Sequence, residues 1–323
     1  MPGIALRRLL WLKLCIFIWI LLPARQHPRW FQLDESRTDL FREQIGFTSI
    51  RHGFGVRLVL TAFHRSSRMA RSPEPECRQK TLSARARRNF LYSLPQKLLA
   101  EFIGTFILIF FAVGAICADQ YLHAASQTPI GTLGVALAYG LTYAIMVGAI
   151  SHISGGHMNP AVTAGYWVTR RLGTLQALLY WIAQILGAIA ATYLLVAIVP
   201  DAIWTSAGRG VTLLAPDFTR LHAMLLEGVM TFFLVFVVFA TLVDARSAFN
   251  KMSSFAIGLT ISVGVLFGGP FTGAAINPAR AFAPALAARY WSNHGVYWVG
   301  PLLGGVLAAV IYDRLFLSDQ PPL

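Results

Sequence analysis

The chain has 323 residues, of which 56% are hydrophobic and only 13% are charged. A composition this apolar excludes an ordinary soluble domain and indicates a protein with several membrane spans. The formal net charge of +13 is concentrated in residues 1–97, which hold 18 Lys/Arg and 6 Asp/Glu. The basic excess is therefore a property of the N-terminal segment, and we predict no nucleic-acid partner.

Residues 1–95 are predicted to form a basic, disordered N-terminal extension, because they are rich in Arg, Ser and Pro and lack a sustained hydrophobic period. The apolar run from Leu9 to Leu22 resembles a signal peptide, but it is short for a span and no clear cleavage site follows it. Two alternatives stay open. Translation could start at Met69, or the basic tail could bind lipid headgroups.

Apolar runs long enough to cross a bilayer follow this extension and predict an all-α membrane protein with six transmembrane helices. Residues 96–317 are expected to form this domain, and residues 318–323 are expected to be a short C-terminal tail. The six spans are predicted at residues 97–118, 131–151, 175–199, 219–243, 253–269 and 296–316.

The distribution of Lys and Arg beside the spans predicts the orientation of the chain. Arg85, Arg87, Arg88 and Lys97 precede the first span, and more basic residues fall on that side than on the other. Both termini are therefore expected in the cytoplasm. Because no segment resembles an organelle address, we expect a multi-pass protein of the plasma membrane.

The tripeptide Asn-Pro-Ala occurs twice, as Asn159-Pro160-Ala161 and as Asn277-Pro278-Ala279. Asn is a preferred helix N-cap, and Pro is favoured at the first helical position. Each motif therefore predicts a helix start, with the amide NH₂ of the Asn left free as a neutral donor. An arginine follows twelve residues later, as Arg171 and Arg289. A helix of that length spans roughly 18 Å, a little over half of a bilayer core.

The two motifs belong to a larger internal repeat with an offset of 118 residues, which also relates Gly140-Leu141-Thr142 to Gly258-Leu259-Thr260. Each half, residues 96–200 and 218–317, is predicted to contain a helix, a second helix, a half-helix and a third helix. Because three full spans is an odd number, the second half must be inverted relative to the first. Half-helices that meet at the midplane of an inverted repeat indicate a solute site.

Residues 96–317 resemble an aquaporin, of the major intrinsic protein family. The resemblance rests on the two Asn-Pro-Ala motifs, on Arg280 three residues after the second Asn, and on Glu101 and Glu227, which open the two halves. It implies a passive channel that conducts water and small neutral solutes, excludes ions and protons, needs no cofactor and forms a homotetramer. The stretches 268–273 and 297–301 further resemble the plant vacuolar branch or its bacterial relatives.

The resemblance also assigns a selectivity filter to Tyr139, Val265, Ala274 and Arg280. Strict water channels of the family usually have Phe and His at the first two positions, so Tyr139 and Val265 depart from the pattern. Loss of the imidazole removes a polar wall, so ammonia, hydrogen peroxide and small metalloid acids stay open as alternative solutes. A glycerol facilitator is a weaker alternative, because Ala281 stands where glycerol-type members usually have Asp.

Glu101 and Glu227 are acids inside predicted spans, and such residues suggest a functional site. One alternative is a proton-coupled transporter. Their mirrored positions favour a bracing role instead, in which each accepts hydrogen bonds from the irregular backbone ahead of a half-helix. His157 is expected to brace the first of these loops. We predict no metal site and no enzyme activity, since no ligand spacing, nucleophile–base pair or phosphate loop is found.

Overall fold

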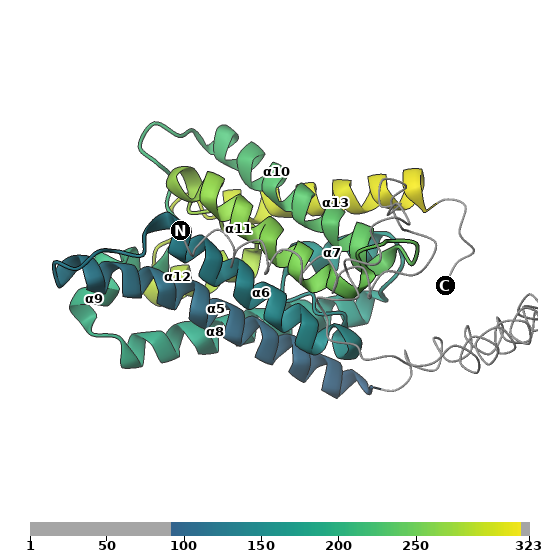
Figure 1. Ribbon diagram of the computed structural model, residues 1–323, viewed down its shortest axis with the longest axis horizontal. Helices are drawn as coiled ribbons and strands as arrows, with labels where there is room; N and C mark the ends of the chain where they lie inside the picture. The colour runs from purple at the N-terminus through teal and green to yellow at the C-terminus, as the bar shows by residue number, and fades with distance from the viewer. Residues whose placement is uncertain (1–91, 318–323) are drawn as a thin grey trace, which may run out of the picture. The chain divides into compact units, whose positions relative to one another are not determined.

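The computed structural model describes residues 92–317, which form helices joined by loops (Figure 1). Within residues 92–317, six helices are long and apolar enough to cross a membrane, which confirms the predicted fold class. The predictions for residues 1–91, including the Met69 start, and for the C-terminal tail lie outside the described residues. The six spanning helices are α5 (Leu94–Ala124), α6 (Gly131–Ser154), α8 (Thr174–Ile198), α10 (Arg220–Val238), α11 (Ser253–Thr272) and α13 (Val296–Phe316).

The first span is longer than predicted, because its polar last turns continue the helix beyond residue 118. Polarity marks where a helix leaves the apolar layer, and it does not mark where the helix ends. The carboxylate of Asp119 in these turns accepts a hydrogen bond of 2.7 Å from the backbone N–H of Gly131. This bond ties the end of α5 to the start of α6.

Two half-helices, α7 (Pro160–Val168) and α12 (Pro278–Ala288), begin at the two motifs. Shorter elements complete the chain. A helical turn, α9 (Asp201–Ser206), and a 3₁₀ turn, η3 (Gly208–Gly210), lie between α8 and α10. A π-helical turn, η4 (Phe239–Val243), extends α10, and a 3₁₀ turn, η5 (Asn250–Met252), precedes α11.

The half-helices have nine and 11 residues, so both are shorter than the twelve-residue spacing to Arg171 and Arg289 suggested. An arginine in the left-handed conformation follows each one, Arg170 with φ 59° two residues after α7 and Arg289 with φ 54° directly after α12. The next N–H bonds back across the turn, from Arg171 to Tyr166 and from Tyr290 to Ala285. These are Schellman-type ends, in which backbone geometry closes the helix. Arg171 itself lies beyond the end of α7.

The packing of the helices follows the internal repeat. In the first half, α5 packs against α6 and α8, and in the second half α10 packs against α11 and α13. The halves are joined by α6 on α11 and by the exchange of half-helices, because α7 packs on α13 and α12 packs on α8. Figure 1 shows α7 and α12 towards opposite ends of the bundle. This arrangement is the predicted inverted repeat.

The contact between α6 and α11 requires glycine on both helices. A Cβ atom added to Gly140 would overlap the carbonyl oxygen of Gly258, and a Cβ on Gly258 would overlap the carbonyl oxygen of Gly140. The two backbones therefore touch directly, as small residues allow in membrane helices. The outer faces are apolar instead, with Ile145, Leu175 and Leu303 being 67%, 69% and 66% exposed. Such faces suit contact with lipid.

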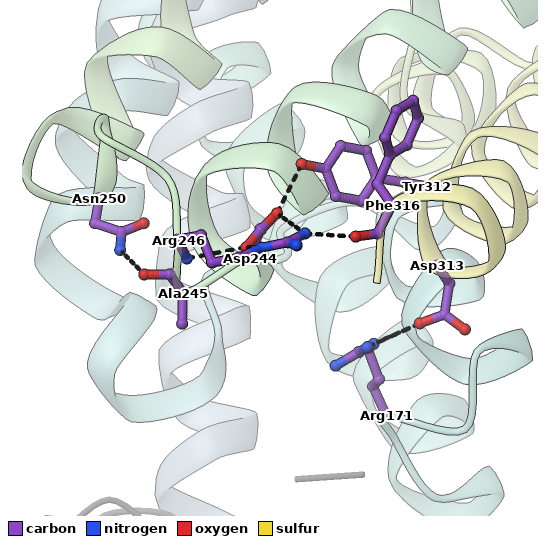
Figure 2. A network of polar contacts seen from close by, with 8 residues as sticks. All are labelled: Arg171, Asp244, Ala245, Arg246, Asn250, Tyr312, Asp313 and Phe316. Atoms are coloured by element: carbon purple, nitrogen blue, oxygen red, sulfur yellow. Dashed lines mark hydrogen bonds and ion pairs between the residues drawn. The ribbon is translucent and has the colours of Figure 1, made fainter. Parts of the chain in front are cut away.

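A polar cluster ties the loop after α10 to the end of α13 (Figure 2). The guanidinium of Arg246 donates to Asp244 Oδ2 over 2.9 Å and also to the carbonyl oxygen of Phe316. The hydroxyl of Tyr312 donates to the same carboxylate over 3.2 Å. Arg246 thus contacts a carbonyl oxygen at the C-terminal end of α13, where the helix dipole favours a cation.

The acid in this cluster gives a testable pH dependence. Hydrogen bonds from Arg246 lower the pKa of Asp244 to about 2, below the ordinary value of about 3.9. A lowered carboxyl pKa stabilises the fold above the ordinary value, and this contribution is lost as the pH falls through the folded value. We therefore expect Asp244→Asn to lower the thermal unfolding midpoint in detergent at pH 7. The difference from the wild type should shrink below about pH 4 and vanish near pH 2.

Asp313→Asn is the matched control, because it removes the ion pair of 2.8 Å between Asp313 and Arg171. The side chain of Arg171 is 22% exposed and that of Asp313 is 31% exposed. Asp313 is less buried than Asp244 and accepts hydrogen bonds from Arg171, whereas Asp244 accepts from Arg246 and also from Tyr312, so the control variant should shift the midpoint less. An equal effect of the two variants, or a difference for Asp244→Asn that stays constant with pH, would contradict the assignment.

Candidate solute pore

The two motif asparagines cap the half-helices that follow them. Asn159 Oδ1 accepts the backbone N–H of Ala161 over 2.8 Å, and Asn277 Oδ1 accepts that of Ala279 over 2.9 Å. Proline at the first helical position adds no unsatisfied N–H, as expected for a helix start. Both asparagine side chains are fully buried. The two positive helix N-termini therefore lie inside the protein.

The asparagines also bind the backbone of the opposite motif. Asn159 Nδ2 donates to the carbonyl oxygen of Ile276 over 3.0 Å, and Asn277 Nδ2 donates to that of Met158 over 2.8 Å. The two loops therefore hold each other reciprocally. The expectation of a wholly free NH₂ group was wrong, because one of its two hydrogens is used in each case. One N–H on each asparagine is left for a solute.

Glu101 on α5 holds the backbone of the first loop. Its carboxylate accepts four hydrogen bonds, from Ser154 Oγ at 2.7 Å, His157 N at 2.9 Å, Met158 N at 2.7 Å and Gln184 Nε2 at 2.8 Å. Glu101 is fully buried. An ionised carboxylate has no hydrogen to donate and acts only as an acceptor. All four partners are donors, which suits this form.

Glu227 on α10 occupies the equivalent place in the second half. It accepts three hydrogen bonds, from Thr272 Oγ1 at 2.7 Å, Ala275 N at 2.9 Å and Ile276 N at 2.7 Å. The partners are the repeat equivalents of those of Glu101, except that no counterpart of Gln184 contributes. Both acids therefore contact the irregular backbone immediately ahead of a half-helix.

His157 lies within the first loop and is buried, with 2% exposure. Its Nδ1 lies 3.0 Å from Thr163 Oγ1 on α7, and its ring lies 4.3 Å from the ring of Tyr166 between centroids. Thr163 Oγ1 in turn accepts a hydrogen bond of 3.0 Å from Gln184 Nε2. A chain of polar contacts thus connects the imidazole through Thr163 and Gln184 to Glu101.

The loops ahead of both half-helices adopt the left-handed conformation at equivalent positions. Met158 has φ 50° and Ile276 has φ 56°, although neither residue is glycine. A left-handed β-branched residue such as Ile276 is unusual and needs support from its surroundings. The hydrogen bonds to Glu101 and Glu227 supply that support at the adjoining peptide groups.

The four residues assigned to the filter lie on different elements, namely α6, α11, the second loop and α12. Tyr139 donates its hydroxyl to the carbonyl oxygen of Ala275 over 3.2 Å, which brings α6 against the loop that contains Ala274. Arg280 Nη1 donates to the carbonyl oxygen of Gly210 over 2.8 Å. Val265 and Ala274 are buried in the same apolar cluster as Tyr139.

Several residues of this region carried no assignment from the sequence. The hydroxyl of Tyr143 donates to the carbonyl of His157, and those of Tyr180 and Tyr297 donate to the carbonyls that end α6 and α11. Tyr180 and Tyr297 are separated by 117 residues, close to the repeat offset, so their spacing could have indicated a shared role. Gly210 had no such signal, because it lies in a loop without a counterpart in the first half.

Comparison with known proteins agrees with this geometry. A family model described as "Major intrinsic protein" matches residues 91–312. The chain belongs to this family. The resemblance to aquaporins is therefore confirmed, and the family is one of membrane channels.

Individual members of the major intrinsic protein family match about two thirds of this chain. "Aquaporin TIP4-4" of Zea mays is 44% identical over 68% of this chain and 86% of its own length. "Aquaporin-4" of Mus musculus is 36% identical over 68% of this chain and 67% of its own length. A solved structure of the aquaglyceroporin from Plasmodium falciparum shares the fold, with a TM-score of 0.61, 23% identity, and coverage of 70% of this chain and 98% of that one.

The contacts of the two acids predict a difference in stability between matched variants. Glu101→Gln removes charge-assisted bonds and turns an amide NH₂ towards backbone donors, so we expect a loss of about 2–4 kcal/mol. Glu227→Gln disturbs three bonds where Glu101→Gln disturbs four, so its loss should be smaller. Unfolding of the purified variants in detergent, followed by intrinsic fluorescence, measures both losses. Unchanged stability in Glu101→Gln would contradict a bracing role.

Proposed function

We propose that the chain is a passive channel that conducts water and excludes ions and protons. The observation that carries this proposal is the meeting of two buried half-helix N-termini, each tipped by an asparagine with one uncommitted N–H. Two such donors can bind one water oxygen and orient it, which interrupts a proton wire. Each helix N-terminus is equivalent to roughly +0.5 charge, so both repel cations.

The backbone of the two loops supports a polar path beside these donors. The carbonyl oxygens of Gly155, Gly156, Gly273 and Ala274 accept no hydrogen bond from the part of the chain that the structure describes. Non-helical backbone at membrane depth is tolerated where it is buried in protein or lines a water-filled cavity. These carbonyls are therefore the acceptors that we assign to passing solutes, in an otherwise apolar tube.

Arg280 is proposed as the charged member of the filter. It is 3% exposed, and its Nη1 donates a hydrogen bond to a neutral carbonyl, that of Gly210. A guanidinium has five N–H donors, so donors remain for a solute while its charge repels cations. Tyr139, Val265 and Ala274 are proposed as the other members of the filter.

The apolar and small side chains of Val265 and Ala274 favour a second candidate function, which is the passage of further small neutral solutes. A filter with fewer polar side chains than that of a water-only channel would also admit ammonia, hydrogen peroxide and metalloid acids. A glycerol facilitator is the weaker variant of this candidate.

A proton-coupled transporter is the rival from a different class. It would need Glu101 and Glu227 to exchange protons with the solution. Their oxygens instead accept hydrogen bonds from backbone and side-chain donors, and both residues are fully buried. These contacts favour our proposal that the acids, together with His157, brace the loops. Water flux that followed an imposed pH gradient would favour the transporter.

We further propose that the chain forms a homotetramer in the plasma membrane and that both termini lie on the cytoplasmic side. The basic residues Arg171 and Arg246 lie beside the end of α13 (Figure 2), which supports one basic side of the bundle. The mass of the purified protein in detergent, corrected for bound detergent, tests the tetramer. Surface labelling of single cysteines on intact cells tests the orientation and the membrane.

The first experiment is stopped-flow light scattering on proteoliposomes that contain the full chain. After an osmotic step with an impermeant solute, the vesicles should shrink at least about tenfold faster than empty liposomes, with a low activation energy, because a pore replaces partition into lipid. Glycerol entry should stay slow. Arg280→Val should admit larger neutral solutes and weaken cation exclusion, because it removes the buried charge. Shrinkage no faster than in empty liposomes would contradict the proposal.

The filter makes a second, independent prediction. Val265→His introduces a polar ring that narrows the opening, so we expect hydrogen peroxide and ammonia entry to fall several-fold relative to water. Peroxide entry is followed with an encapsulated fluorescent probe and ammonia entry with a pH dye. Val263→His is the matched control, because residue 263 is 64% exposed on the outer face of α11. Unchanged peroxide and ammonia entry in Val265→His would count against this filter assignment.

A further inference from the structure

Two tyrosines of α6 reach the equivalent peptide groups of both motif loops. Tyr143 donates its hydroxyl to the carbonyl oxygen of His157 over 2.7 Å, and Tyr139 donates to that of Ala275 over 3.2 Å. The tyrosines are four residues apart, so they lie one above the other on one face of the helix. Their acceptors, His157 and Ala275, are related by the 118-residue repeat. One helix therefore contacts both loops at the same position.

Each of these peptide groups is held at both ends. A peptide bond is planar, so the carbonyl of His157 and the N–H of Met158 move as one unit. Tyr143 binds the carbonyl, while Glu101 accepts the N–H over 2.7 Å. In the second loop Tyr139 binds the carbonyl of Ala275, and Glu227 accepts the N–H of Ile276 over 2.7 Å.

The next peptide group in each loop orients a pore asparagine. The carbonyl oxygen of Met158 accepts from Asn277 over 2.8 Å, and that of Ile276 accepts from Asn159 over 3.0 Å. Met158 and Ile276 are also the non-glycine residues held at positive φ. If the preceding peptide plane is released, this strained residue can relax. The carbonyl that aims the asparagine then turns away.

We propose that Tyr143 and Tyr139 are positioning residues of the pore, each of which aims the asparagine of one motif through the neighbouring peptide group. Tyr143 acts on Asn277, and Tyr139 acts on Asn159. The inference rests on the proposed water-channel function, because the aimed N–H groups are the donors to water. The two tyrosines thereby determine whether both asparagine N–H groups can donate to one water oxygen at the same time.

The chain offers two matched controls. Tyr180 and Tyr297 are also buried, and each donates its hydroxyl over 2.8 Å to a backbone carbonyl, that of Ser154 and that of Thr272. These carbonyls end α6 and α11, four residues before Met158 and Ile276. Removal of the Tyr297 hydroxyl costs one comparable hydrogen bond, and removal of the Tyr180 hydroxyl also ends the bond of 3.0 Å that it accepts from Gln176 Nε2. Both changes leave the clamped peptide groups in place.

The experiment compares Tyr→Phe variants at all four positions in proteoliposomes, with channel number determined in each preparation. Tyr143→Phe should lower the water permeability per channel about fivefold and raise its activation energy, since one orienting hydrogen bond is lost. Tyr139→Phe also changes a proposed filter residue to the one that strict water channels usually carry, so its positioning role is tested by its coupling to the asparagines in the double-mutant cycle below. Tyr180→Phe and Tyr297→Phe should lower the thermal midpoint comparably but keep the wild-type permeability and activation energy. Equal permeability across the four variants would overturn the proposal.

A double-mutant cycle tests the crossed pairing. Asn277→Ser keeps an N-cap oxygen and removes the amide donor. Combined with Tyr143→Phe, it should be non-additive in water permeability, because both changes remove the same aimed donor. Combined with Tyr139→Phe, it should be additive, since that tyrosine acts on Asn159. Additivity in both pairs would also overturn the proposal.

The outcomes separate this inference from the function on which it rests. A wild-type chain that conducts no water faster than empty liposomes contradicts the proposed function. A wild type that conducts well, with four equivalent Tyr→Phe variants, contradicts only the positioning role of Tyr143 and Tyr139.

Discussion

The structure depends on one constraint, which is that backbone broken inside a membrane must still find hydrogen-bond partners. Each half of the chain ends a spanning helix, turns through left-handed residues and starts a half-helix whose N-terminus is buried in the bundle. Glu101 and Glu227 meet this demand by accepting the N–H groups of the two turns. Because the partners are carboxylates, the bonds are charge-assisted and stronger than neutral ones. The loops can therefore hold strained conformations that the pore geometry requires.

The same constraint also accounts for the selectivity that we propose for this region. With the turn N–H groups bound to protein, the two loops leave carbonyl oxygens and one N–H on each asparagine, beside the remaining donors of Arg280. In the proposed channel, a passing molecule donates to the carbonyls and accepts from the asparagines, which suits a small neutral solute such as water. An ion would have to lose its hydration shell against two positive helix ends. The proposed selectivity thus follows from which backbone groups are already satisfied.

Much of this arrangement could be predicted from the sequence, because it rests on local rules and a visible repeat. Asn159 and Asn277 indicate helix starts because Asn is a preferred N-cap residue, and the 118-residue offset predicts the inverted halves. The ends of α7 and α12 were less predictable, since left-handed arginines close them where no glycine signals a stop. The crossed bonds between loops could not be derived, because they join residues more than 100 positions apart. Contacts such as that of Arg280 with Gly210 depend on loop conformation alone.

The two halves are not equivalent, because different side chains support the first and the second motif loop. In the first half, Gln184 and Thr163 extend the contacts of Glu101 to His157. In the second half the corresponding positions hold Pro301 and Ala281, which have no side-chain donor. The second loop is closely approached from outside the repeat, where a Cβ on Gly273 would lie 3.1 Å from Thr212 Cα and where the carbonyl oxygen of Gly210 accepts from Arg280. The proposed filter residue Arg280 therefore depends on a segment outside the repeat, whereas the first loop is supported by Gln184 and Thr163 from its own half.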